Sequence, residues 1–310
     1  MGLSPEELRN RLRGLFSFPV TPFTEHLEVD LARYREQIRW MIGGKPAALF
    51  VCGGTGEFFS LDLAEYRSLV KTAVEEADGR LPVIAGAGYG TRLAVSFAKA
   101  AEDADADGLL ILPPYLIQAD QQGLYDHYSR VAAGTNLGLI LYQRDNAIFD
   151  PPTAARLSEL QNIIGFKDGY GNMERLLRIQ KEAGDRLVII NGMPTAELSA
   201  AAFKGLGIIN YSSAVFNFVP SIARAFYEAL VQGDGPATDR LLDAFYRPLA
   251  ELRDRRKGYA VSLIKAGLKA VGKTAGPVRP PLVDCSREEE DALKAIIAKG
   301  LAAASKKHPG

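Results

Sequence analysis

Eight short apolar runs alternate with amphipathic segments from residue 14 to about residue 230, and this alternation constrains the fold more than any other feature. Each run is apolar on both faces, which is typical of parallel strands covered by helices. The runs are Gly14–Val20, Ala47–Cys52, Pro82–Gly86, Gly108–Pro113, Leu137–Tyr142, Ile163–Lys167, Leu187–Asn191 and Gly207–Ser212.

The intervening segments have the period of helices. Leu31, Tyr34, Ile38 and Met41, for example, recur at helical spacing. Eight strand–helix units of roughly 20–35 residues predict the α/β class and a (β/α)₈ TIM barrel. An open doubly wound sheet is the rival, but it should carry Gly-x-Gly-x-x-Gly after its first strand. The nearest glycine cluster, Gly86–Gly90, follows the third run and has the wrong spacing.

After the eighth run the alternation stops and helical patterns continue to the end of the chain. The expected helices are Val219–Val231, Ala237–Arg255, Tyr259–Val271 and Arg287–Ala304. We therefore expect residues 1–225 to form the barrel and residues 226–310 to form a C-terminal helical extension packed on it. A capping helix should begin at the N-terminus, where Ser4, Pro5 and Glu7 form a capping-box pattern.

Charge and composition exclude several classes of protein. The 37 basic and 37 acidic residues cancel, so binding to nucleic acid or to a membrane surface through bulk charge is not expected. No run approaches the ~20 apolar residues of a membrane span, and the first residues lack a secretory signal pattern. Cys52, Cys285, His26, His127 and His308 have no metal-ligand spacing. We expect a cytoplasmic protein that uses no metal.

A lysine at the end of an apolar strand is the most informative candidate. Active sites of such barrels lie at the C-terminal ends of the strands, where Lys167 follows Phe166. Burial lowers the pKa of a lysine, and a neutral amine can form a Schiff base with a ketone. The alternative is a lysine whose ammonium reaches solvent. Asp168 would alternate to the opposite face and cap the following turn.

Two candidates follow the preceding strand. Tyr142 closes an apolar run and could carry protons beside Lys167, although a core tyrosine is the alternative. Arg144 could bind a carboxylate with its planar fork or form only an exposed salt bridge.

The glycine-rich loop after the second strand is a candidate anion site. Gly54 and Thr55 lie among glycines that leave backbone N–H groups free, and the loop is expected to open a helix. It lacks the Gly-Lys-[Ser/Thr] ending of a P-loop, and a plain tight turn is the alternative.

Taken together, these motifs resemble one enzyme family. Over about residues 12–285, the chain resembles the dihydrodipicolinate synthase / N-acetylneuraminate lyase family. The motifs are Phe18–Phe23, Gly53–Glu57, Pro113–Tyr115, Tyr142 and Gly165–Asp168. Five stretches are more similar to the members of this family that dehydrate 5-dehydro-4-deoxyglucarate. These are Gly53–Leu61, Ala85–Arg92, Arg144–Ala147, Tyr211–Phe218 and Arg253–Tyr259.

The resemblance implies a homotetramer, built as a dimer of dimers, that needs no cofactor. The implied reaction converts 5-dehydro-4-deoxy-D-glucarate, a keto-deoxy sugar diacid, to 2,5-dioxopentanoate with loss of water and carbon dioxide. By the same resemblance, Lys167 forms the Schiff base and Tyr142 relays protons. Gly54 and Thr55 match positions that bind the carboxylate next to the ketone, and Tyr115 matches a residue that reaches toward a neighbouring subunit.

Further substrate-binding candidates are less specific. Ser212, Ser213 and Arg144 could hold hydroxyls or the distal carboxylate, and Gly192 is a further candidate. The sequence departs from the synthases at Leu116, where they carry a second tyrosine. Two other functions stay open: a 2-keto-3-deoxy-acid aldolase of the same family, and a non-catalytic barrel that binds a keto acid.

Overall fold

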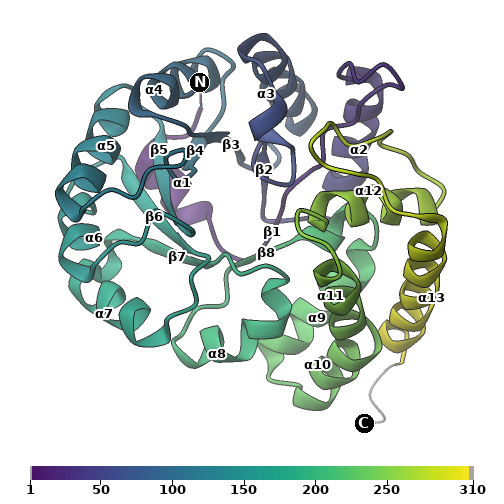
Figure 1. The fold of residues 1–310 in the computed structure, drawn as a ribbon. Helices are drawn as coiled ribbons and strands as arrows, with labels where there is room; N and C mark the ends of the chain where they lie inside the picture. The colour runs from purple at the N-terminus through teal and green to yellow at the C-terminus, as the bar shows by residue number, and fades with distance from the viewer. Residues whose placement is uncertain (1, 307–310) are drawn as a thin grey trace.

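The computed structural model describes residues 2–306 as a closed barrel of eight parallel strands inside a ring of helices (Figure 1). The strands follow one another around the barrel in sequence order, and the first pairs with the last. This closure confirms the predicted (β/α)₈ barrel and excludes the open sheet. The strands are β1 (Leu15–Ser17), β2 (Ala48–Val51), β3 (Val83–Ala87), β4 (Gly108–Ile111), β5 (Gly138–Gln143), β6 (Ile163–Asp168), β7 (Val188–Asn191) and β8 (Tyr211–Ser213).

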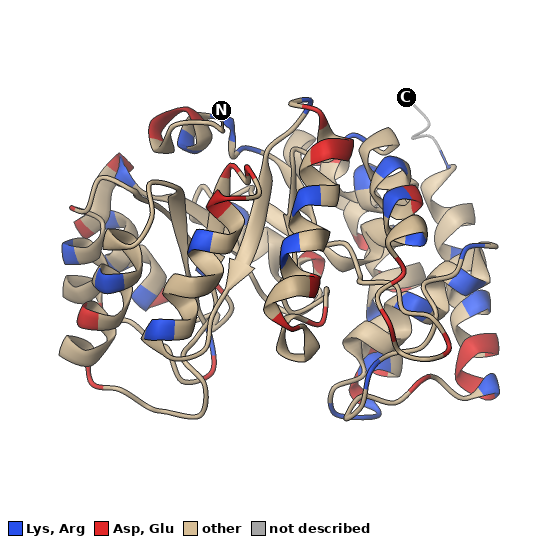
Figure 2. Cartoon of the chain, turned by 90° about the horizontal axis from the view of Figure 1, so that it is seen from above, with Lys and Arg blue, Asp and Glu red and all other residues tan. Residues whose placement is uncertain are grey.

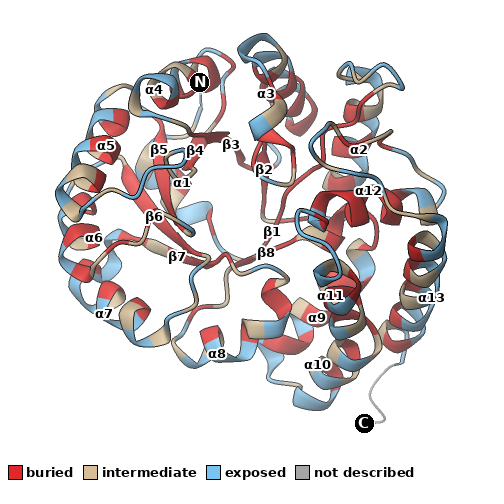
Figure 3. Cartoon of the chain, viewed as in Figure 1, coloured by how far each residue is buried: buried red, intermediate tan, exposed pale blue. Residues whose placement is uncertain are grey.

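One α-helix follows each strand and packs on the outside of the barrel. Figure 3 shows that the buried face of these helices is turned inward, as their amphipathic sequences require. The helices are α2 (Leu31–Gly43), α3 (Leu63–Ala77), α4 (Thr91–Glu102), α5 (Gln121–Ala133), α6 (Pro151–Leu157), α7 (Met173–Ala183), α8 (Ala200–Gly205) and α9 (Pro220–Gln232).

Apolar side chains from alternate strand positions fill the barrel interior. Phe16, Phe50, Ile140 and other inward side chains form one buried cluster. Leu8 joins this cluster from helix α1 (Pro5–Arg11), which begins with the predicted capping box. Helix α1 contacts β5 and β6, so it caps the barrel at the end opposite the strand C-termini.

The C-terminal helices pack together beside the barrel. They are α10 (Gly235–Leu241), the π-helical turn η5 (Leu242–Tyr246), α11 (Arg247–Asp254), α12 (Ala260–Ala270) and α13 (Arg287–Ala304). Helix α13 contacts α9, α10, α11, α12 and η5. The predicted division at residues 225/226 falls inside α9 and stays a prediction.

Acidic and basic residues are interspersed over the helices (Figure 2). No helix within residues 2–306 is long and apolar enough to cross a membrane. His308 lies outside the described residues.

The last strand is shorter than predicted. Residues 207–210 do not join β8, which begins only at Tyr211. Gly207 has a φ of +78° and turns the chain. Asn210 then uses its side chain for bonds to the Gly14 amide (2.8 Å) and the Ile189 carbonyl (3.3 Å). These contacts tie the chain to Gly14 and to β7 just before β8 begins.

Candidate active site

One large cavity, of about 970 Å³, opens at the C-terminal ends of the strands. Eight of the nine residues predicted for the site line it together: Gly54, Thr55, Tyr115, Tyr142, Arg144, Lys167, Gly192 and Ser212. They come from segments far apart in the sequence, and the barrel closure brings them to one mouth.

Lys167 lies at the bottom of this cavity with 5 % of its surface exposed. It pairs with Tyr142 across β5 and β6, and its Nζ atom is 4.1 Å from the centroid of the Tyr142 ring. The same atom is 4.4 Å from the centroid of the Phe18 ring. This burial rules out the alternative of a lysine that reaches solvent.

The environment of Lys167 favours the neutral amine. Burial lowers the pKa of Lys167 below its ordinary value, and the nearby Arg144 guanidinium acts in the same direction. The Tyr142 side chain opposes both effects but does not cancel them. A larger fraction of Lys167 is therefore available as a nucleophile at neutral pH.

Tyr142 is placed to exchange protons beside the lysine. Its hydroxyl donates to the Gly192 carbonyl at 3.3 Å and accepts from Arg144 Nη1 at 3.5 Å. Burial alone would raise the pKa of Tyr142. The positive charges of Lys167 and Arg144 outweigh that effect, so the pKa of Tyr142 lies below its ordinary value.

Gly192 leaves space for the lysine. A Cβ atom at this position would lie 2.7 Å from Lys167 Cγ and 3.0 Å from Lys167 Cε. Its carbonyl also accepts the hydrogen bond from Tyr142. Gly192 thus contacts both reactive side chains.

The Gly54–Thr55 turn presents free backbone amides to the cavity. Within residues 2–306 neither amide has an intramolecular partner, so both are available to an anion. The expectation that this loop opens a helix is wrong. It leads into a 3₁₀ turn, Phe58–Ser60, and α3 begins only at Leu63 behind its own cap, Asp62.

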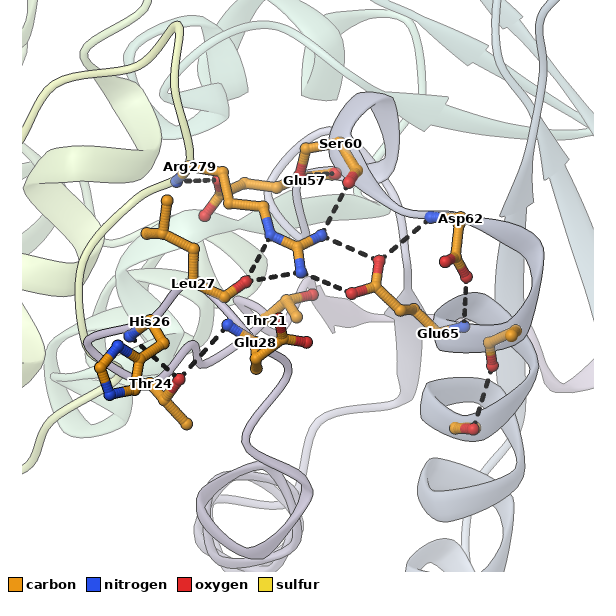
Figure 4. Close-up of polar contacts among 12 residues, drawn as sticks. Thr21, Thr24, His26, Leu27, Glu28, Glu57, Ser60, Asp62, Glu65 and Arg279 are labelled. Atoms are coloured by element: carbon orange, nitrogen blue, oxygen red, sulfur yellow. Dashed lines mark hydrogen bonds and ion pairs between the residues drawn. The ribbon is translucent and has the colours of Figure 1, made fainter.

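A buried ion pair supports this turn from behind. The Glu57 side chain is fully buried, and its Oε1 atom lies 2.8 Å from Lys265 Nζ on α12. Its Oε2 atom accepts from the Arg279 amide at 3.0 Å. Figure 4 shows that the Arg279 side chain continues the contact to Ser60 and Glu65. The C-terminal helical region therefore holds the Gly54–Thr55 turn in place.

The two residues beside the reactive pair point away from the cavity. Asp168 accepts from the amides of Tyr170 (3.2 Å) and Gly171 (3.1 Å), which confirms that it caps the turn after β6. Gln143 donates to Asp168 at 2.8 Å and accepts from the Phe149 amide at 2.9 Å. Gln143 therefore shapes the backbone and does not line the cavity.

Ser213 is the predicted site residue that does not line the cavity. Residues of a strand alternate between its faces, so Ser212 faces the cavity and Ser213 faces outward. The Ser213 hydroxyl donates to Glu197 Oε1 at 2.5 Å. Burial raises the pKa of Glu197 to about 7.

Two parts of the cavity wall were not predicted. Phe18 contacts Lys167. It lies two positions after Phe16 in the first apolar run, and this spacing indicates that both side chains face the barrel interior. The segment Arg253–Tyr259, recognised only as a similarity, also lines the cavity, except for Arg255. Among residues 2–306, no three His, Cys, Asp or Glu side chains are grouped so that they could hold a metal ion.

Comparisons with known proteins identify the family of the chain. The model of the Dihydrodipicolinate synthetase family matches residues 11–300. The chain is 50 % identical to the "Probable 5-dehydro-4-deoxyglucarate dehydratase" of Rhizobium rhizogenes, over 97 % of this chain and 100 % of that protein. It is 51 % identical to the protein of the same name from Streptomyces griseus, over 95 % of each chain.

A crystal structure of dihydrodipicolinate synthase from Bacillus clausii has the same fold. Its TM-score is 0.87 at 27 % identity, and the match covers 94 % of this chain and 98 % of that one. The family match and the relatives both extend over nearly the whole chain. The chain therefore belongs to the dihydrodipicolinate synthetase family.

Proposed function

We propose that this enzyme converts 5-dehydro-4-deoxy-D-glucarate to 2,5-dioxopentanoate, water and carbon dioxide through a Schiff base on Lys167. The observation that carries the proposal is the buried Lys167, whose pKa is lowered by burial and whose ammonium lies against Tyr142. The names of the relatives at about half identity support this choice of substrate.

The first half of the reaction needs a nucleophile and a base. Neutral Lys167 attacks the ketone to form a carbinolamine and then an iminium, which withdraws electrons from the neighbouring CH₂ group. Tyr142 removes a proton from that carbon, directly or through the lysine nitrogen. The resulting enamine expels hydroxide from the β-carbon, and the proton that converts the hydroxide to water comes from the same relay.

The second half uses the conjugated iminium left by water loss. The bond to the distal carboxylate breaks, carbon dioxide leaves, and its electron pair moves through the conjugated chain to the iminium nitrogen. Protonation of the enol and enamine carbons and hydrolysis of the imine release the dioxo acid and restore Lys167. No oxidant or reductant is needed, since the substrate carbons exchange electrons only among themselves.

The cavity also supplies groups for binding. The free amides of Gly54 and Thr55 would hold the carboxylate next to the ketone. Ser212, which faces the cavity, would bind a substrate hydroxyl. Arg144 would lower the pKa of Tyr142 and remain within reach of the substrate.

Product analysis tests the proposal. The purified protein, given 5-dehydro-4-deoxyglucarate, should release one carbon dioxide and one 2,5-dioxopentanoate per substrate consumed, and Lys167→Met should release neither. Pyruvate release without carbon dioxide would instead establish the aldolase. Saturable binding without turnover would establish a barrel that only binds the keto acid.

A homotetramer, as a dimer of dimers, is part of the proposal. Tyr115, Leu116 and Ile117 are 66, 77 and 64 % exposed in the single chain, an apolar group that a neighbouring subunit would cover. Tyr115 and Leu116 also line the cavity, so this neighbour would help to close the site. Sedimentation equilibrium should give four times the chain mass. The cytoplasmic location stays a prediction.

A further inference from the structure

The end of α11 and the loop that joins it to α12 form a basic part of the cavity wall. Residues Arg253–Lys257 include four basic side chains and one acidic one, in a chain whose total charge is zero. Arg253, Arg256 and Lys257 line the cavity. We propose that Arg253, assisted by Lys257, binds the distal carboxylate of the substrate. This assignment rests on the proposed function, because only a diacid brings a second carboxylate to this wall.

Arg253 is held in one place. Its Nη1 atom donates to the Thr195 hydroxyl, and its Nε and Nη2 atoms donate to Asp254 at 2.7 and 3.0 Å. Only 19 % of its side chain is exposed. A guanidinium has five N–H donors, and these contacts use three of them. One N–H remains on each terminal nitrogen and can donate to a carboxylate.

Arg253 and Lys167 line the same cavity, and a short segment of chain contacts both. Gly192 contacts Lys167, and Thr195, three residues later, contacts Arg253. Three residues span at most about 10 Å of extended chain. In an extended six-carbon diacid, the distal carboxylate oxygens lie about 6 Å from the ketone carbon, at ~1.5 Å per C–C bond. The proposal therefore places the distal carboxylate in the part of the cavity that Arg253 lines.

The cavity-lining guanidiniums of Arg144 and Arg256 each have an acidic partner, as Arg253 has in Asp254. Arg144 donates to the Tyr142 hydroxyl and pairs with Asp145 at 2.8 Å, so its charge acts on the proton-transfer side of the site. Lys257, in contrast, has no intramolecular partner among residues 2–306 and is free to pair with an anion. Two positive groups with remaining donors, Arg253 at the end of α11 and Lys257 in the following loop, thus line the cavity.

The role of Arg253 should appear mainly in binding. Carbon dioxide leaves as a neutral molecule, so a charge on the distal carboxylate is present in the bound substrate and fades during decarboxylation. An ion pair to that carboxylate therefore stabilises the bound substrate more than it stabilises the transition state of decarboxylation. We expect Arg253→Gln to raise KM for the diacid by about 10-fold or more, with a smaller change in kcat.

Borohydride trapping with two keto acids of equal length tests the assignment without requiring turnover. The probes are 2-oxoadipate, which has a distal carboxylate, and 2-oxohexanoate, which ends in a methyl group. The half-saturating concentration for trapping at Lys167 is measured for each probe. The wild type should favour 2-oxoadipate by about 10-fold or more. Arg253→Gln should lose that preference, and Arg253→Lys should recover part of it.

Arg255→Gln is the matched control. Arg255 lies two residues after Arg253 and carries the same charge, but it does not line the cavity, so the preference should stay. If Arg253→Gln keeps the full preference, the assignment of Arg253 is overturned while the proposed function stands. If the wild type traps both probes equally, no distal-carboxylate site exists. If it traps neither at Lys167, the proposed function and this assignment are both overturned.

Discussion

Lys167 Nζ lies 4.1 Å from the ring centroid of Tyr142, because the two residues are paired in register on adjacent strands. The proposed nucleophile and the proposed proton carrier are thus neighbours on adjacent strands of the barrel. Each also shifts the other's protonation: the lysine charge lowers the pKa of Tyr142, while the tyrosine opposes the effect of burial on the pKa of Lys167. A substitution at either residue should therefore change the pKa of the other.

Removing the Tyr142 hydroxyl should separate proton transfer from Schiff-base formation. Tyr142→Phe keeps the ring against Lys167 but removes the relay, so kcat should fall by about 10²–10⁴-fold. Borohydride trapping of pyruvate on Lys167 should persist, since the amine remains. Loss of both activities with an intact fold would show that the hydroxyl is also needed for imine formation. An unchanged kcat would contradict its role.

Removing the charge of Arg144 should shift the pH profile. That charge lowers the pKa of both Tyr142 and Lys167, so Arg144→Gln should raise both. Both groups act in their deprotonated forms, and the rising limb of kcat/KM against pH should therefore move to higher pH. Arg255→Gln, outside the cavity, should leave the limb in place. A limb that does not move in Arg144→Gln would contradict the electrostatic coupling.

Breaking the buried Glu57–Lys265 ion pair should lower the free energy of unfolding more than replacing both of its charged groups. Lys265→Met leaves the Glu57 carboxylate buried without its counter-ion and should destabilise the fold by about 3–5 kcal/mol. In the double variant Lys265→Met/Glu57→Gln no charge is left behind, so the loss should be smaller than in Lys265→Met alone. Urea unfolding measures both. The coupling would be contradicted if the loss of unfolding free energy in the double variant equalled the summed losses of Lys265→Met and Glu57→Gln.

Glu197 should make the stability of the fold depend on pH. Its pKa is raised from 4.5 to about 7 by burial, so between these values the folded state binds more protons than the unfolded state. Stability should therefore fall as pH rises through this window, by about 3 kcal/mol in total, and then level off. Glu197→Gln should remove this slope in chemical denaturation at pH 5 and pH 8. An equal slope in both proteins would show that Glu197 titrates normally.

The sequence was sufficient to predict the barrel because strands and helices have different periods. Apolar runs on both faces mark covered strands, and a charged residue at the end of such a run, Lys167, stands out against them. The exact register of each strand could not be predicted from the sequence with the same precision. Ser212 and Ser213 differ by one position, and one position decides which face of the strand a side chain occupies.

Contacts between residues far apart in the sequence could not be predicted from sequence patterns. Glu57 and Lys265 are more than 200 positions apart, and nothing near either residue indicates the other. The cavity-lining role of Arg253 also depends on where the loop after α11 folds back, which helical periodicity does not specify. The resemblance to a family predicted the reactive pair, while the supporting contacts required the structure.

The central claim is that Lys167 forms the covalent intermediate, and trapping followed by peptide mapping tests it most directly. The protein is incubated with pyruvate or the proposed substrate, reduced with borohydride, digested and analysed by mass spectrometry. The account predicts a single reduced adduct on the peptide that contains Lys167, and no adduct in Lys167→Met. An adduct on any other lysine, or turnover of the substrate by Lys167→Met, would contradict it.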